Sequence, residues 1–302
     1  MEKIKLTILG NCGSVPQKDK SFSSSIISYF GNNLLFDCPE GTQKQLMKSK
    51  ISLMKIDNIF ISHMHTDHFL GLFGWIITMQ LNNRSEPLTI FSPTWGKQKI
   101  ERMLKEIIKP SFQIIYKEIK KGTIYKNDFF EVKAFPLDHE ISCFGFVFKE
   151  KDKEGVFDRK KAEKLGIPVG PLYSKLIEGK KIKVNDKIFT KKDVFDYSKR
   201  RIGRKITIAM DSRPCKETIN NAKNSDILVH ESTFLNDELT KAKKTKHSTA
   251  KEASEIAKKA NVKKLILIHF SARTNNIKEF ENEARENFKN SFAPNEFDEF
   301  QI

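Results

Sequence analysis

Four metal-capable side chains fall within six residues of this chain, in the segment His63-Met64-His65-Thr66-Asp67-His68. They directly follow the apolar run Asn58–Ile61, which predicts a short buried strand. The three imidazoles and the carboxylate would then lie in the loop at the carboxyl end of that strand, where open α/β sheets place their functional sites. Because buried imidazoles and carboxylates are costly unless they are paired or bind metal, the spacing predicts a metal site.

Further polar side chains follow other apolar runs, at the point where each run ends. If these runs form strands of one or two sheets, their carboxyl ends converge on one edge and bring six or seven nitrogen and oxygen ligands together. That number is enough for two zinc ions with an exchangeable position left open. A ligand set without Cys favours Zn²⁺, with Mn²⁺ or Fe as alternatives. The four side chains are His139, Asp211, His230 and His269.

Strand-like and helix-like segments alternate along the 302 residues, which predicts a layered α/β fold in a single domain spanning residues 1–302. Thr249 and Glu252 form a capping box that predicts a helix beginning there. The other expected helices are Gly41–Lys50, Leu70–Leu81 and Lys97–Ile108. The expected strands include Lys3–Leu9, Leu88–Phe91, Phe129–Leu137, Lys205–Met210 and Leu265–Ile268.

Positive charge is concentrated in one part of the chain. The formal net charge is +16, and residues 149–204 alone hold 18 Lys and Arg against nine Asp and Glu. This segment also has Gly and Pro residues and weak strand signals, so we expect an inserted arm at 149–204. Such a surplus of Lys and Arg favours contact with the phosphates of a nucleic acid. The alternative is a solvated, lysine-rich loop.

The four Cys, at positions 12, 38, 143 and 215, form no Cys-x-x-Cys pair, so neither a zinc ribbon nor a redox dithiol is indicated. Scattered Cys fit buried, reduced thiols. The N-terminus is not typical of a signal peptide, and no apolar run approaches the ~20 residues of a membrane span. We therefore expect a soluble protein in the cytoplasm, with no membrane contact.

The His-x-His-x-Asp-His run, with its downstream His and Asp residues, resembles the metallo-β-lactamase superfamily, whose fold is an αβ/βα sandwich. Three further features resemble ribonuclease Z, the tRNA 3′-end endonuclease. They are His230-Glu231-Ser232-Thr233, His247-Ser248-Thr249 before a helix, and Leu165-Gly166-Ile167-Pro168-Val169-Gly170-Pro171-Leu172-Tyr173. The resemblance runs from about Lys3 to Arg273.

The resemblance implies a role for each matching residue. One zinc ion would be held by His63, His65 and His139, the other by Asp67, His68 and His269, with Asp211 bridging them. Asp67 would also orient or deprotonate the attacking water. His247 would give a proton to the leaving 3′ oxygen, with Glu231 orienting its imidazole. Substrate contacts would come from Arg273, Lys18, and Gly170 and Pro171 of the arm.

The resemblance also implies precursor tRNA as the substrate, with a 3′-hydroxyl tRNA and a 5′-phosphate trailer as products. The arm of one subunit would serve the active site of its partner, so a homodimer is implied. One loop departs from the family pattern Pro-x-Lys-x-Arg-Asn: Pro16 and Lys18 match, but Lys20 replaces the Arg and Ser21 the Asn. Discrimination against a mature CCA end and the cleavage position are therefore in question.

Two other functions fit parts of the sequence. A small phosphodiesterase, lactonase or thioesterase would use the same metal site, since fold and metals do not determine the substrate. Such an enzyme has no use for a strongly basic arm, so the arm distinguishes the two hypotheses. A non-catalytic RNA-binding protein would be expected to lack some ligands, whereas all seven ligand positions are filled here.

Overall fold

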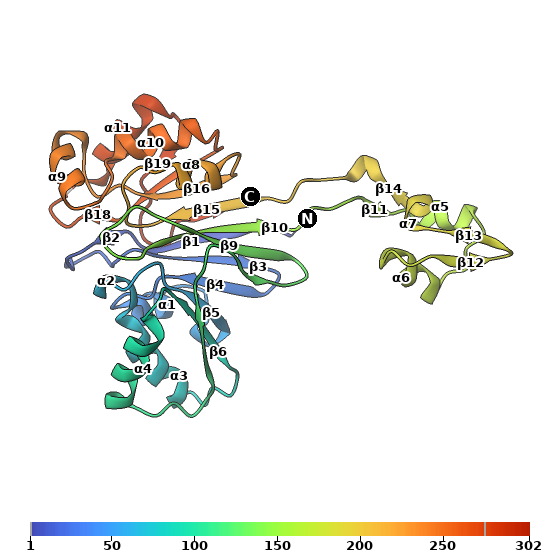
Figure 1. Cartoon of the computed structure of the whole chain (residues 1–302), viewed down its shortest axis with the longest axis horizontal. Helices are drawn as coiled ribbons and strands as arrows, with labels where there is room; N and C mark the ends of the chain where they lie inside the picture. Colours follow the sequence, from blue (N-terminus) through green and yellow to red (C-terminus); the bar gives the residue numbers. More distant parts are fainter. Residues whose placement is uncertain (1, 275) are drawn as a thin grey trace. The chain divides into compact units, whose positions relative to one another are not determined.

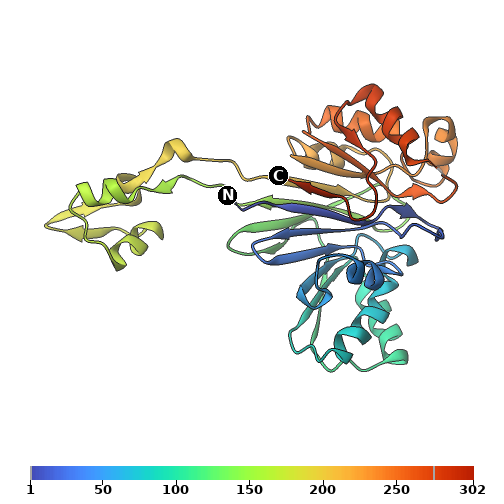
Figure 2. The same ribbon diagram turned by 180° about the vertical axis from the view of Figure 1, so that it is seen from behind.

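The computed structural model of the chain describes residues 2–274 and 276–302. These residues divide into two compact units (Figures 1 and 2). Unit 1 comprises Met1–Lys149 and Lys205–Ile302, and unit 2 comprises Glu150–Arg204. Each unit has a hydrophobic core of its own. No helix in the described ranges has the length and apolarity that a membrane crossing requires.

The first sheet of unit 1 has seven strands and contains the strand before the histidine motif. Its central strands β4, β5 and β6 run parallel, so their carboxyl ends lie at one edge. The strand order is β20 (Glu299–Gln301), β1 (Lys5–Gly10), β3 (Ser24–Tyr29), β4 (Asn32–Phe36), β5 (Ile56–Phe60), β6 (Leu88–Ser92) and β7 (Ile114–Glu118).

The second sheet also has seven strands, and β15, β16 and β17 run parallel within it. Residues of the two sheets pack face to face in one core that includes Phe36, Phe60, Phe146 and Ile208. The strand order is β19 (Ser291–Phe292), β17 (Leu265–Ile268), β16 (Ile227–Glu231), β15 (Lys205–Ala209), β10 (Phe144–Glu150), β9 (Phe130–Pro136) and β8 (Gly122–Lys126).

Helices cover the outer face of each sheet, which completes four layers (Figure 1). The apolar helix α3 packs on the first sheet through Trp75 and Ile76, and α10 packs on the second through Ala253 and Ile256. The capping box predicted at Thr249 and Glu252 is present at the start of α10. The helices are α1 (Thr42–Lys48), α2 (Thr66–Phe69), α3 (Gly71–Leu81), α4 (Gly96–Ile107), α8 (Lys216–Ala222), α9 (Leu239–Lys244), α10 (Ala250–Lys259) and α11 (Ile277–Asn287).

Some elements of unit 1 were not predicted. Strand β20 pairs with β1 from the other end of the chain, with Lys5 opposite Gln301. Strands β7 and β8 lie at the edges of their sheets, and their half-buried faces carry little apolar alternation. Two short strands, β2 (Cys12–Gly13) and β18 (Phe270–Ser271), pair with each other and bring the first loop beside the segment after β17.

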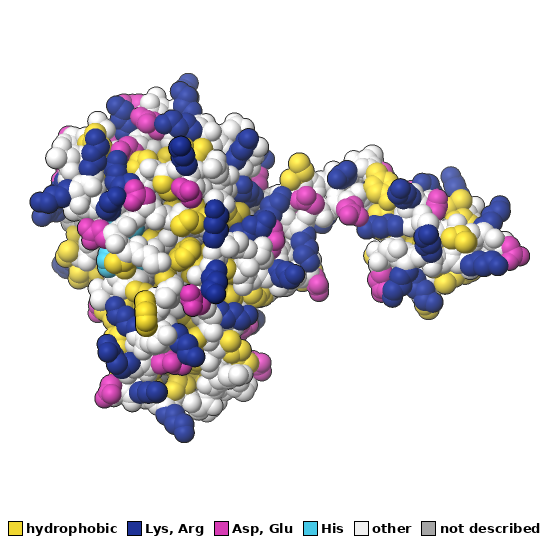
Figure 3. Space-filling view, viewed as in Figure 1, with side chains coloured by type: hydrophobic (Ala, Val, Ile, Leu, Met, Phe, Trp, Pro, Cys, Tyr) yellow, Lys and Arg dark blue, Asp and Glu magenta, His cyan; other side chains and the backbone are white. Residues whose placement is uncertain are grey.

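Unit 2 is built from short elements around a small apolar core. Ala162, Leu176, Ile182 and Val194 are buried in it, and Phe157 and Tyr173 pack against it. The elements are β11 (Val156–Phe157), α5 (Arg159–Lys164), α6 (Pro171–Ile177), β12 (Ile182–Val184), β13 (Lys187–Phe189), α7 (Lys191–Val194) and β14 (Phe195–Asp196). Lys and Arg side chains are closely spaced on the face of unit 2 that Figure 3 shows.

Candidate metal centre

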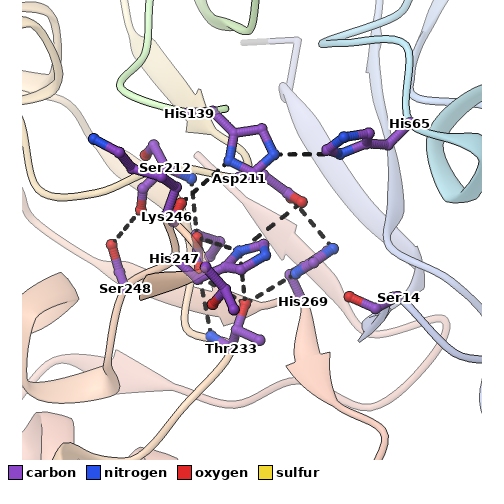
Figure 4. Close-up of polar contacts among 12 residues, drawn as sticks. Ser14, His65, His139, Asp211, Ser212, Thr233, Lys246, His247, Ser248 and His269 are labelled. Atoms are coloured by element: carbon purple, nitrogen blue, oxygen red, sulfur yellow. Dashed lines mark hydrogen bonds and ion pairs between the residues drawn. The ribbon is translucent and has the colours of Figure 1, made fainter. Parts of the chain in front are cut away.

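Seven of the residues predicted as metal ligands meet at one edge of the two sheets. Figure 4 shows four of them, His65, His139, Asp211 and His269. His63 and His65 lie in the loop that follows β5, and Asp67 and His68 lie in α2 directly after it. Three other candidate ligands each lie in the loop that follows the carboxyl end of a strand. These ligands are His139 after β9, Asp211 after β15 and His269 after β17.

Seven side chains form two adjoining groups that could each hold a metal ion. His63, His65, His139 and Asp211 make the first, and Asp67, His68 and His269 make the second; within each group the candidate ligand atoms lie within 4.8 Å of one another. Asp211 also reaches the second group, because its Oδ1 lies 3.2 Å from Nε2 of His269 and 3.5 Å from Nε2 of His68. One carboxylate therefore lies between the two groups.

The buried polar atoms at this centre fit a bound cation. Nε2 of His68, Nε2 of His269 and Oδ1 of Asp211 are buried and have no hydrogen-bond partner within the described residues. Leaving a buried polar atom unpaired costs about 1–3 kcal/mol, so three such atoms facing one another are unstable as a purely protein arrangement. Imidazole nitrogens and carboxylate oxygens without Cys suit a borderline divalent cation such as Zn²⁺.

In three of the histidines Nδ1 has a hydrogen-bond partner, which leaves Nε2 for the centre. Nδ1 of His68 lies 2.8 Å from Oδ2 of Asp37. Asp37 also accepts a hydrogen bond from the Ser62 hydroxyl, which can therefore accept one from Nδ1 of His63 at 2.9 Å. Nδ1 of His139 lies 3.2 Å from the Lys246 carbonyl oxygen. These contacts hold each imidazole in one orientation.

His269 is held by a similar relay on the other side of the centre. The Thr233 hydroxyl donates to Oε2 of Glu231 at 2.8 Å and lies 3.0 Å from Nδ1 of His269, from which it can accept. The other carboxylate oxygen of Glu231 lies 2.9 Å from Nδ1 of His247. Glu231 therefore orients both a candidate ligand and His247.

The protonation states of His247 and of three candidate ligands suit these roles. Burial lowers the pKa of His63, His65 and His139, with repulsion from neighbouring imidazoles acting in the same direction, so their nitrogens stay neutral as ligands must be. Burial would likewise lower the pKa of His247, but the charge and hydrogen bond of Glu231 outweigh it and raise the pKa to about 9. His247 therefore carries a proton at neutral pH.

Four residues around the centre have strained backbone conformations. Ser14, Asp37, Lys246 and His269 all have left-handed backbone conformations, with φ between 57° and 62°. Such conformations cost on the order of 1–3 kcal/mol each in residues other than glycine, and they gather at functional sites. The loop beside His269 requires glycine for another reason: a Cβ on Gly13 would lie 2.5 Å from the His269 ring.

The structure places the other predicted residues as follows. Arg273 is exposed and lines a pocket together with His247. Lys18 is exposed in the loop that follows β2. Gly170 and Pro171 begin helix α6 of unit 2, so they belong to a different unit from the centre. His230 is fully buried and lies outside both ligand groups, so the structure does not bring it to the centre with the other polar residues expected at the ends of strands.

Two residues that sequence reasoning missed hold the loops together. Arg213 donates from its backbone to the Asp138 carbonyl and from its guanidinium to the His247 carbonyl and to Glu252. Lys246 gives its carbonyl to His139 while its ammonium pairs with Asp138 at 2.9 Å. In the sequence these two residues stand close to Asp211 and His247, but that position does not indicate the contacts they make.

Removal of the Thr233 hydroxyl is expected to weaken metal binding. In Thr233→Val, Nδ1 of His269 loses its acceptor and Glu231 loses a donor, while the side-chain volume is kept. Losing such an outer hydrogen bond typically costs about 10–100-fold in metal affinity. Competition with a chromophoric chelator would measure the change. Thr233→Ser, which keeps the hydroxyl, should retain most of the affinity; equal loss in both variants would show that the methyl packing matters instead.

The fold and the centre together define a metal-dependent hydrolase of the metallo-β-lactamase fold. The structure superimposes on a metallo-β-lactamase fold protein, YhfI from Bacillus subtilis, with a TM-score of 0.71 over 100% of both chains at 17% identity. It superimposes equally well, with a TM-score of 0.71, on the short form of human tRNase Z, covering 98% of both chains at 26% identity. The predicted αβ/βα sandwich is thereby confirmed.

The sequence comparisons extend over nearly the whole chain. Ribonuclease Z of Archaeoglobus fulgidus is 42% identical over 303 residues, which cover 99% of this chain and 97% of that protein. The family model described as Anti-Pycsar protein Apyc1 matches residues 4–291. The chain belongs to the ribonuclease Z family, and it also falls within the family that the Apyc1 model describes.

Proposed function

We propose that this protein is a metal-dependent endoribonuclease that removes the 3′ trailer from precursor tRNA. Its products are a tRNA with a 3′-hydroxyl and a trailer with a 5′-phosphate. The observation that carries this proposal is the His247–Glu231 pair, 2.9 Å apart, beside a two-group ligand cluster in a chain that matches ribonuclease Z over its full length. That match favours tRNA over the small phosphodiesters or thioesters that the same cluster would serve.

The residues of the centre would hold two zinc ions, with Mn²⁺ as the alternative. His63, His65 and His139 would bind one, Asp67, His68 and His269 the other, and Asp211 would contact both. Divalent cations held there would activate water at neutral pH and stabilise the charge that develops on the phosphate.

Two side chains of the protein, Asp67 and His247, would then accept and donate protons. Asp67, whose Oδ2 accepts the Ser14 backbone N–H at 2.9 Å, is positioned to orient and deprotonate the attacking water. Nδ1 of His247 is hydrogen-bonded to Glu231, so Nε2 is the atom that can protonate the leaving 3′ oxygen. His247 also lies within ligand distance of Asp211 and His269, but the hydrogen bond to Glu231 favours its role as proton donor.

Unit 2 supplies the remaining part of the proposal. Its residues fall within the segment 149–204, for which we propose the role of a substrate-binding arm: its Lys and Arg side chains would bind tRNA phosphates, with Gly170 and Pro171 at the start of α6. Arg273 and Lys18 would contact RNA near the cleavage site. We also propose a homodimer in which the arm of each subunit binds tRNA for its partner. The four free Cys support a reducing compartment, the cytoplasm.

Glu231→Gln is expected to lower kcat by about 10²-fold, because the neutral amide no longer favours the protonated imidazole of His247. Without the carboxylate the pKa of His247 falls, so the basic limb of the pH–rate profile moves to lower pH. Single-turnover cleavage across pH measures both effects. A uniform loss of rate with an unmoved profile would contradict the role of Glu231 in setting the protonation of His247.

The test of the function is trailer release from a 3′-extended precursor tRNA by the purified chain. We expect one intact trailer, lost after chelation and restored by Zn²⁺ or Mn²⁺, with a 5′-phosphate that permits ligation and a 3′-hydroxyl on the tRNA. Binding of the precursor without cleavage, when both metals are supplied, would reject the proposal. Rapid turnover of small phosphodiesters with no tRNA cleavage would favour the alternative hydrolase.

A further inference from the structure

A pocket of about 220 Å³ adjoins the metal centre on the side of His247. Four segments of the chain build it, and none of its lining residues belongs to the two ligand groups. We call it the His247 pocket, and it is lined by Gly13, Ser14, Val15, Thr233, Phe234, Lys241, Thr245, His247, Ser271, Ala272 and Arg273.

The walls of the His247 pocket combine apolar surface with two basic side chains. Val15 is 58% exposed although it is a large apolar residue, and Phe234 also lines the pocket, with its ring centroid 6.2 Å from that of His247 in an edge-on arrangement. Lys241 is held over the Phe234 ring at 4.6 Å and pairs with Glu238 at 2.9 Å. Arg273 is exposed at the wall. A flat apolar group next to a phosphate matches these walls.

The volume restricts the occupant. Pockets for drug-sized ligands span about 300–1,000 Å³, so the His247 pocket is too small for such a molecule or for a base pair. A single unpaired nucleobase is flat and apolar on its faces, and proteins recognise such bases by packing them against apolar or aromatic side chains. The occupant suggested by shape and charge is therefore one unstacked base with an adjacent phosphate.

The position of His247 indicates which nucleotide supplies that base. Nδ1 of His247 is bound to Glu231, and the ring of His247 also forms a wall of the pocket. In the proposed function His247 protonates the 3′ oxygen that leaves the phosphate, and that oxygen belongs to the last nucleotide of the tRNA. The base attached to the same ribose is the base closest to the pocket.

We infer that the His247 pocket binds the base of the last tRNA nucleotide, so that Val15 is a specificity-determining residue for the nucleotide on the 5′ side of the cut. This inference rests on the proposed function. It assigns to Val15 and Lys241 a substrate contact that the ligand cluster does not provide. It also predicts that the enzyme requires a base at this position and is indifferent to the base of the first trailer nucleotide.

The experiment uses three precursor tRNAs: the intact one, one with an abasic last tRNA nucleotide, and one with an abasic first trailer nucleotide. Each is cleaved by the wild type, by Val15→Trp, which fills the pocket, and by Ile107→Trp, which adds the same bulk at a residue 52% exposed at the end of α4. We expect the wild type to lose about tenfold in kcat/KM on the first abasic substrate and little on the second.

Val15→Trp should show about the same tenfold loss on the intact substrate and no further loss on the substrate lacking the last tRNA base. On that substrate it should equal the wild type, which also shows that the variant is folded. Ile107→Trp should behave as the wild type throughout.

Three results would overturn the inference. They are a wild-type loss confined to the abasic trailer nucleotide, no loss on either abasic substrate, and additive losses for Val15→Trp and the missing tRNA base. Failure of the wild type to cleave the intact precursor is a separate outcome, since it rejects the proposed function itself and this inference with it.

Discussion

Asp67→Ala is expected to abolish trailer release, with kcat lowered by about 10³-fold or more. Removing the carboxylate takes away both a candidate ligand and the group placed to accept a proton from water, and general-base catalysis alone contributes about 10²–10⁴-fold. Asp67 is well placed for both roles, since its Oδ2 lies 3.6 Å from Nε2 of His68 and 3.7 Å from Nε2 of His269. Single-turnover cleavage of a labelled precursor measures the effect.

Binding of the precursor should survive in Asp67→Ala, because the arm and the pocket are unchanged. A filter-binding Kd close to that of the wild type, together with lost cleavage, separates chemistry from binding. Asp128→Ala removes a carboxylate from an exposed turn before β9 and serves as the control, with no expected effect. Cleavage by Asp67→Ala at more than about a tenth of the wild-type rate would remove Asp67 from the mechanism.

Deletion of unit 2 is expected to lower kcat/KM for precursor tRNA by about 10²-fold or more, mainly through KM. Each lost phosphate contact weakens binding and flattens its salt dependence. The structure shows how to delete it: Lys149 of β10 lies opposite Lys205 of β15 in an antiparallel pair. Replacing Glu150–Arg204 by Asn-Gly would therefore close these strands with a two-residue hairpin turn.

Hydrolysis of a small phosphodiester such as bis(p-nitrophenyl) phosphate should be unchanged by the deletion, since the centre lies in unit 1. Unchanged tRNA cleavage together with strong small-ester turnover would instead favour a small-molecule hydrolase. A finer test compares two sets of four Lys→Gln substitutions of equal charge, both at exposed positions. The hairpin set in unit 2 is Lys180, Lys181, Lys183 and Lys187, and the control set in unit 1 is Lys105, Lys126, Lys223 and Lys258.

The hairpin set should weaken tRNA binding and reduce the slope of log K against log salt by more than the control set does. If net charge alone mattered, the two sets would be equivalent, because each removes four positive charges. An equal effect would therefore reject a specific role for unit 2 and favour the solvated, lysine-rich loop as its interpretation.

Much of the site was predictable because its signals are local. His63, His65, Asp67 and His68 lie within six residues, directly after a strand whose apolar residues are consecutive. Asp211 and His269 likewise follow buried strands β15 and β17. A polar residue that follows the carboxyl end of a strand lies at the edge of the sheet. The structure places all of these side chains at that edge, as the pattern predicts.

The remaining elements could not be predicted because they depend on partners far away in the sequence. Strand β20 forms only because β1, nearly the whole chain away, offers an open edge. Edge strands β7 and β8 show weak alternation because none of their residues is fully buried, which leaves little hydrophobic pattern to detect. Sequence patterns indicate an element through its local hydrophobic periodicity, whereas these elements are ordered by pairing with strands that are distant in the sequence.

Neighbouring residues in the sequence are enough to indicate the α/β class, the basic segment and the candidate ligand types at strand ends. How the candidate ligands are held follows from the tertiary structure alone. Thr233 links Glu231 to His269, which lies 36 positions after Thr233 in the sequence. The Lys246 carbonyl lies beside His139, 107 positions away, and Gly13 leaves room for the His269 ring, 256 positions away. Such contacts depend on the path of loops between packed layers, which no local propensity specifies. The His247 pocket likewise depends on how four distant segments of the chain come together.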